Sequence, residues 1–150
     1  KAHHPDVVNH ALKFVEKKDH TQFDYVVMLQ PTSPFRKSKH IIEAIKKFLK
    51  ERNDSLISVK KQDYPPWWLF TLKKNKLFQF LKFKNKNVFN LERQEFPKLF
   101  RPNGAIYISK RNVLYSGNLI NPKSCGYYVM DEKDSIDIDS LIDLKVAENI

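Results

Sequence analysis

Two aspartates near the carboxyl end of the chain, Asp137 and Asp139, are the strongest candidates for metal chemistry. They alternate with isoleucines, and in an extended segment residues i and i+2 lie on the same side. Two such carboxylates can point at one Mg²⁺, a hard cation that prefers oxygen ligands and keeps several waters. On this spacing alone, two solvated acids at a polar strand edge are the more frequent arrangement, so both interpretations stay open.

A second polar group follows the apolar run Tyr25–Leu29 and contains Gln30, then Thr32 and Ser33 between two prolines. These neutral side chains both donate and accept hydrogen bonds, which suits sugar hydroxyls or an amide. Turn formation around the prolines is the alternative interpretation.

Arg93 and Arg101 flank a turn-rich segment, and either guanidinium can bind a carboxylate or phosphate through two hydrogen bonds. A surface ion pair is the alternative for each of them. Gly104, which is one of only three glycines, indicates a positive φ or a close approach of the backbone. The five histidines have no partner at metal-binding spacing, and no P-loop or G-x-G-x-x-G motif occurs.

Apolar periodicity predicts the elements that position these side chains. Amphipathic helices are expected over residues 6–18, then 38–51 with Ser38 as the cap, and finally from a capping box at Ser140–Asp143 through Ala147. Strands are expected over residues 24–29, 56–59, 105–108 and 126–130. The α-β-α-β order at the start predicts neighbouring parallel strands, with Gln30 at the carboxyl end of a central strand, where ligands gather in open α/β sheets.

The character of the chain changes after Lys60. Prolines and aromatic residues, including Trp67 and Trp68, exclude a helix interior. Residues 69–72 and 77–81 predict a hairpin around a polar turn. An aromatic hairpin of this kind either marks an interface or covers its own core, and the sequence does not separate these two possibilities.

Composition is that of one globular domain, with 150 residues, 41% hydrophobic content and no apolar run near the length of a membrane span. A single cysteine, Cys125, fits a reducing compartment such as the cytoplasm. The net charge of +10 raises the possibility of nucleic-acid binding, with Trp67 and Trp68 as stacking platforms. The lysines are spread along the chain, however, so we expect anionic small substrates and neither a nucleic-acid nor a membrane partner.

Four motifs occur in an order that resembles one enzyme family. They are D-V-V-x-x-A-L at residues 6–12, L-Q-P-T-S-P-F-R at 29–36, R-Q followed by N-G-A-I-Y within 93–107, and I-D-I-D-x-x-x-D-L-x-x-A-E at 136–148. Together they resemble the CMP-N-acylneuraminate cytidylyltransferases, which activate sialic and related nine-carbon acids. The nucleic-acid hypothesis does not account for this order and ranks below the family.

The resemblance implies that the 2-hydroxyl of a nonulosonic acid attacks the α-phosphate of CTP with the help of Mg²⁺, which produces a CMP-sugar and pyrophosphate. It implies that Asp137 and Asp139 are the catalytic residues and hold the metal. It also implies the substrate-binding residues Gln30, Thr32, Ser33, Arg93, Asn103 and Tyr107. The segment Tyr64–Trp68 lacks the lysine of some family members, so the identity of the acid stays open.

The implied fold is α/β, a Rossmann-like and mostly parallel sheet flanked by helices in a single domain over residues 1–150. Residues 60–103 would form an insertion that carries the aromatic hairpin as a dimerisation arm and covers substrate in a homodimer. The family's amino-terminal A-R-x-G-S-K loop is absent from these residues. We therefore expect a carboxy-terminal part with little transferase activity alone, and the alternative is a non-catalytic, dimeric sugar-acid-binding remnant.

Overall fold

The computed structural model describes residues 3–84 and 87–150. The chain divides into two compact units, one formed by residues 1–60 and 102–150 and the other by residues 61–101. Within the described residues, no helix combines the length and the apolar character that crossing a membrane requires.

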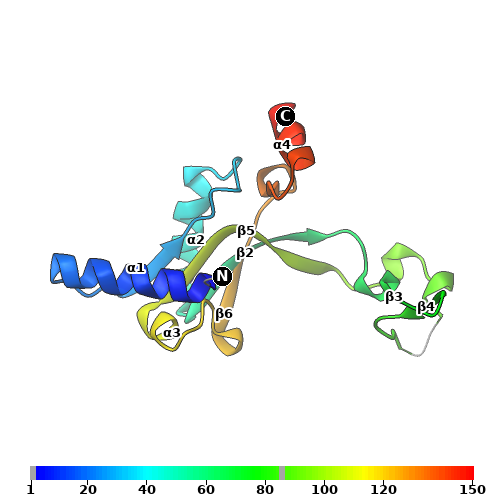
Figure 1. Ribbon diagram of the computed structural model, residues 1–150, viewed down its shortest axis with the longest axis horizontal. Helices are drawn as coiled ribbons and strands as arrows, with labels where there is room; N and C mark the ends of the chain where they lie inside the picture. Colours follow the sequence, from blue (N-terminus) through cyan, green and yellow to red (C-terminus); the bar gives the residue numbers. More distant parts are fainter. Residues whose placement is uncertain (1–2, 85–86) are drawn as a thin grey trace. The chain divides into compact units, whose positions relative to one another are not determined.

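The first unit is built on a four-stranded sheet in the order β1-β5-β2-β6 (Figure 1). Its strands are β1 (Tyr25–Met28), β2 (Ser55–Gln62), β5 (Leu99–Lys110) and β6 (Cys125–Val129). β5 runs antiparallel to β1, with Met28 opposite Tyr107. β5 also runs antiparallel to β2, because the residue numbers of bonded partners rise on one strand as they fall on the other. Lys110 N donates to the Asp54 carbonyl, and Ile106 N donates to Ser58 Oγ. β2 and β6 are parallel.

The expectation of a mostly parallel sheet with β1 at its centre was wrong for the described strands. β5 separates β1 from β2, and β1 lies at one end of the strand order. The reason is the path of the chain. It leaves the sheet through β2, passes through residues 61–101 and returns through β5, so the returning strand runs back along the strand that it left.

The helices of the first unit are α1 (His4–Asp19), α2 (Ser38–Glu51), α3 (Arg111–Tyr115) and α4 (Leu141–Glu148). The three long helices that the sequence predicts are confirmed, whereas α3 was not predicted. Ser38 is not the cap of α2, because Lys37 precedes the helix and its amide donates to Nδ1 of His40. The capping box of α4 is confirmed, since Ser140 N donates to Asp143 Oδ2 over 2.7 Å and Asp143 N donates to Ser140 Oγ over 3.3 Å.

The core of the first unit lies between α2 and the sheet. Its buried members are Ala44, Phe48, Leu56, Ala105, Ile106, Ile108 and Met130. Burial of each large aliphatic side chain contributes about 1.5–3 kcal/mol. Since β5 supplies three of these residues, the strand that carries the N-G-A-I-Y motif is anchored in this core.

The second unit contains the hairpin β3 (Phe70–Lys73) and β4 (Lys76–Gln79), which confirms the predicted hairpin (Figure 1). A separate cluster of Phe83, Val88 and Phe96 packs against Trp67 and Trp68. Trp67 stacks on Phe96 at a centroid distance of 5.4 Å, and Trp68 Nε1 donates to the Val88 carbonyl over 3.2 Å. The tryptophans therefore belong to a small core, and this argues against their use as stacking platforms for nucleic acid.

Candidate active site

Gln30 and Asp137 meet at the open face of Gly104. The pairing of β1 with β5 ends at Met28 and Tyr107, and the residues that follow β1 lie beside residues 104–105 of β5. Gly104 has a φ of +78°, and a Cβ built on it would lie 2.6 Å from Gln30 Oε1 and 3.1 Å from Asp137 Oδ2. The predicted positive φ and close approach at this glycine are both confirmed. A side chain at this position would occupy the space in which the amide and the carboxylate converge.

Arg36 holds the backbone of the polar segment 30–36 in place. Its Nη1 donates to the Gln30 carbonyl over 2.7 Å and to the Ala105 carbonyl over 3.0 Å. One guanidinium therefore ties the end of β1 to β5 on either side of Gly104. Arg36 was not among the predicted site residues, and the one sign of it in the sequence is its place at the end of the L-Q-P-T-S-P-F-R motif.

The segment that carries Asp137 follows the short 3₁₀ helix η5 (Lys133–Ser135) and is not a strand. It is joined to the 30–36 segment by a hydrogen bond from Ile138 N to the Thr32 carbonyl, at 2.9 Å. Thr32 thus joins the two segments through its backbone carbonyl.

Two buried oxygen atoms at this place, Asp137 Oδ1 and Ser33 Oγ, have no hydrogen-bond partner among the described residues. Ser33 is only 3% exposed. A buried polar atom without a partner costs about 1–3 kcal/mol, so such atoms in a functional region indicate a missing ligand, ion or water.

These observations fit a cation held by few protein ligands. No group of three or more His, Cys, Asp or Glu side chains with metal-binding geometry occurs among residues 3–84 and 87–150. Mg²⁺ is usually bound by one or two carboxylates, with waters and substrate phosphates completing its shell. Asp137 offers an unpaired oxygen of this kind. Asp139 is exposed, and its backbone N donates to Asp143 Oδ2 over 3.2 Å.

Asn103 is buried in a hydrogen-bond network and does not present a free amide. Its Oδ1 lies 2.6 Å from Ser58 Oγ and accepts from Ala105 N, and its Nδ2 donates to Ser135 Oγ over 2.8 Å. Both polar ends of the side chain are therefore engaged within the protein. The network joins β2, β5 and η5 directly beside Gly104.

Tyr107 is half-buried on β5. Burial raises the pKa of its hydroxyl above the ordinary value, and the negative charge of Asp137 adds to this effect. The phenol therefore stays protonated at neutral pH and can donate a hydrogen bond near the Asp137 carboxylate. Gln30 and Asp137 are the predicted site residues whose side chains converge at Gly104, and Tyr107 lies near enough for the charge of Asp137 to raise its pKa.

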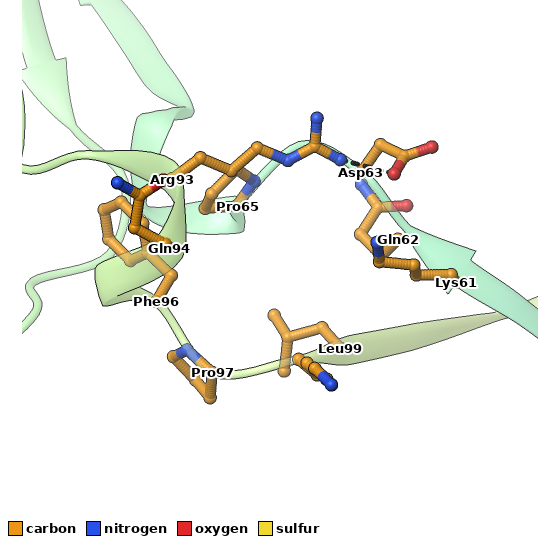
Figure 2. Close-up of a pocket in the computed structure, with 10 residues that line it drawn as sticks. Lys61, Gln62, Asp63, Pro65, Arg93, Gln94, Phe96, Pro97 and Leu99 are labelled. Carbon is orange, nitrogen blue, oxygen red and sulfur yellow. Dashed lines mark hydrogen bonds and ion pairs between the residues drawn. The ribbon is translucent and has the colours of Figure 1, made fainter.

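Arg93 lies in the second unit and lines a cavity of about 530 Å³ there. Figure 2 shows its guanidinium turned toward Asp63, with which it forms an ion pair. Lys61 and Lys98 line the same cavity, so three cationic side chains and one carboxylate surround it. Such a balance favours an anionic ligand.

Comparison with known proteins finds relatives that match nearly the whole chain. No protein-family model matches it. It is 33% identical over 143 residues to the post-translational flagellin modification protein B of Campylobacter coli, covering 95% of this chain and 59% of that protein. It is 32% identical over 151 positions to the N-acylneuraminate cytidylyltransferase of Escherichia coli, covering 97% of this chain and 33% of the relative.

A CMP-N,N'-diacetyllegionaminic acid synthase of Legionella pneumophila is 30% identical over 136 residues, which cover 85% of this chain and 54% of that enzyme. The chain thus spans between one third and three fifths of the length of these relatives. The matches run through nearly all of it, including the segments that form the site around Gly104. Over nearly all of its length, the chain is therefore similar to N-acylneuraminate cytidylyltransferases and CMP-N,N'-diacetyllegionaminic acid synthases.

Proposed function

We propose that the protein transfers CMP from CTP to a nonulosonic acid and releases pyrophosphate. The observation that carries this proposal is the convergence of Gln30 and Asp137 on the open face of Gly104, where three of the four motifs meet. Relatives named as cytidylyltransferases and CMP-sugar acid synthases support it over almost the whole chain.

In this proposal Asp137 and Asp139 hold Mg²⁺, and the unpaired Oδ1 of Asp137 is the first ligand. When bound, the ion would withdraw charge from phosphate oxygens and favour attack on the α-phosphate. The Gln30 amide orients the acceptor by hydrogen bonds to the hydroxyl groups of the sugar acid. The buried Ser33 hydroxyl, which has no partner within the described residues, forms a hydrogen bond with the same ligand. Tyr107 donates a hydrogen bond beside Asp137.

Two predicted residues take supporting roles in the proposal. Thr32 acts through the carbonyl that accepts from Ile138 N, so it fixes the distance between the two site segments. Asn103 acts through its network with Ser58 and Ser135, which keeps the strand around Gly104 in its positive-φ conformation. We assign neither side chain a direct contact with substrate.

The second unit, in this proposal, is a dimerisation arm that binds the acceptor carboxylate through Arg93. The cationic cavity around Arg93 supports the binding role. The support for dimerisation is the exposure of apolar side chains along the hairpin, for example Leu72 at 79% and Leu77 at 63%. Exposed apolar surface of this kind marks protein interfaces. A homodimer in the cytoplasm is therefore part of the proposal.

The test is pyrophosphate release from CTP by the full protein, with sialic, legionaminic and pseudaminic acids as acceptors and Mg²⁺ present. Asp137→Asn removes the charge of the first metal ligand, so we expect kcat to fall about 10²- to 10³-fold. The matched control is Asp6→Asn, which changes an exposed aspartate in the first turn of α1 and should leave kcat unchanged.

Binding of a sugar acid without turnover would contradict the transferase proposal and favour a non-catalytic binding protein on the same scaffold. Equal activity of Asp137→Asn and Asp6→Asn would exclude Asp137 as a metal ligand. Sedimentation of the native protein as a monomer at assay concentration would remove the dimerisation role of the arm.

A further inference from the structure

A charged cluster outside the proposed site joins the start of α2 to the segment that carries Asp137. Asp134 is its centre, with a side chain that is only 9% exposed. Its Oδ1 accepts from Lys37 Nζ over 2.9 Å, and its Oδ2 lies 3.4 Å from His40 Nε2. His40 is 11% exposed, and its Nδ1 accepts from the Lys37 amide over 3.2 Å. We call these three residues the Asp134 tie.

The cluster keeps Asp134 ionised. The Lys37 ammonium, which hydrogen-bonds the carboxylate, is the main cause that lowers the pKa of Asp134, and burial opposes it. A buried carboxylate that loses its partner is costly, so the pair holds its two segments together. Lys37 itself stays largely exposed, with 59% of its side chain accessible.

The position of the tie in the chain is what gives it a role. Lys37 directly follows Arg36, which clamps Gln30 and Ala105. Asp134 precedes Asp137 by three residues. The neighbouring Ser135 Oγ accepts from Asn103, and beyond Asp137 the Ile138 amide donates to Thr32. The short stretch around Asp137 is therefore held at both ends.

We propose that Asp134 is a positioning residue, which holds the Asp137 carboxylate at the Gly104 site through Lys37 and His40. Ala44 and Phe48 anchor α2 in the core. Through the tie, the N-terminal end of this anchored helix sets where the 134–138 segment lies. The part of the inference that concerns Mg²⁺ rests on the proposed function, whereas the tie itself does not.

The experiment uses Asp134→Asn in the full protein, which removes the charge and retains the shape. The matched control is Glu43→Gln, because Glu43 lies beside the same cluster but pairs with Tyr128, whose hydroxyl donates to it over 2.5 Å, and with Lys39, both of which lie outside the 134–138 segment. Two quantities are measured: the exchange rate of the Ile138 amide by NMR, and the dissociation constant of Mn²⁺ as a probe for the metal.

We expect the Ile138 amide to exchange about tenfold faster in Asp134→Asn than in the control, because the tie limits local opening. Loss of a group that orients a metal ligand weakens binding by about tenfold or more, so the Mn²⁺ dissociation constant should rise about tenfold. Lys37→Met removes only the exposed partner and leaves His40 in place. It should therefore change both quantities in the same direction, by about threefold, and it takes over the test if Asp134→Asn does not fold.

Unchanged exchange at Ile138 relative to the control would overturn the tie. Faster exchange with an unchanged Mn²⁺ dissociation constant would show that the tie orders the segment without positioning the carboxylate, and would overturn the positioning role. If the unaltered protein binds no Mn²⁺, the metal part of the proposed function fails, and the Ile138 exchange rate alone decides whether the tie exists.

Discussion

Replacement of Gly104 by alanine perturbs the proposed active site through one added methyl group. At a φ of +78°, an L-residue other than glycine is strained by about 1–2 kcal/mol. The new Cβ would also lie 2.6 Å from Gln30 Oε1, whereas ordinary contact begins near 3.4 Å. The Gln30 amide must therefore retreat by about 0.8 Å, and Asp137 Oδ2, at 3.1 Å, must give way by a few tenths of an ångström.

The two effects have different magnitudes. Gln30 Oε1 is the far end of a flexible side chain, so its retreat adds little to the loss of folding stability. A displacement near 1 Å in a positioned catalytic group, by contrast, can reduce the rate about 10²-fold. We therefore expect Gly104→Ala to lower the free energy of unfolding by about 1–2 kcal/mol and kcat/KM by about 10- to 100-fold.

Gly117→Ala is the matched control, because Gly117 has a φ of +81° and no atom within 4 Å of the added Cβ. It should cost the same strain energy and leave kcat/KM unchanged. Urea unfolding of both variants measures the backbone strain that they share. The pyrophosphate assay measures the effect of the contact between the added Cβ and Gln30 or Asp137, which only Gly104→Ala makes. If the two variants lose the same activity, or if neither does, the convergence of Gln30 and Asp137 on Gly104 does not determine catalysis.

Two further predictions concern charged side chains, Glu16 in the first unit and Arg93 in the second. Hydrogen bonds from Arg111 and Tyr115 lower the pKa of Glu16 from 4.5 to about 2, so the stabilisation that this carboxylate contributes is complete above pH 4.5 and is lost as the pH falls toward 2. Glu16→Gln should therefore have a lower urea midpoint than the unaltered protein near neutral pH and an equal one near pH 2, and a pH-independent difference would contradict this. In the second unit, Arg93→Lys keeps the positive charge but loses the planar guanidinium that forms two parallel hydrogen bonds, so the KM for the sugar acid should rise about tenfold with kcat nearly unchanged. The control is Arg52→Lys, at an exposed position. An equal KM in the two variants would exclude Arg93 from binding the acceptor.

The sequence alone predicted the features that depend on neighbouring residues. Apolar spacing placed the three long helices, and the spacing of Ser140 and Asp143 predicted the capping box of α4. Gly104 was predicted to have a positive φ or a close approach of the backbone, because glycine allows both without the strain or bulk that a side chain brings. The order of the four motifs also resembled that of a family whose members are among the relatives of this chain. All of these are local patterns of residue type and spacing, which one stretch of chain displays without its partners.

Only the tertiary structure decided which distant residues meet. Strand order could not be read from the chain, because an apolar run such as Tyr25–Met28 suits a central or an edge strand, and β5 was free to return on either side of β2. The sequence likewise marked Asn103 as polar but did not reveal that Ser58 and Ser135 occupy its amide. Pairing over long sequence separations depends on the packing of the whole core, where many partners are compatible with each local pattern and only their joint fit selects one.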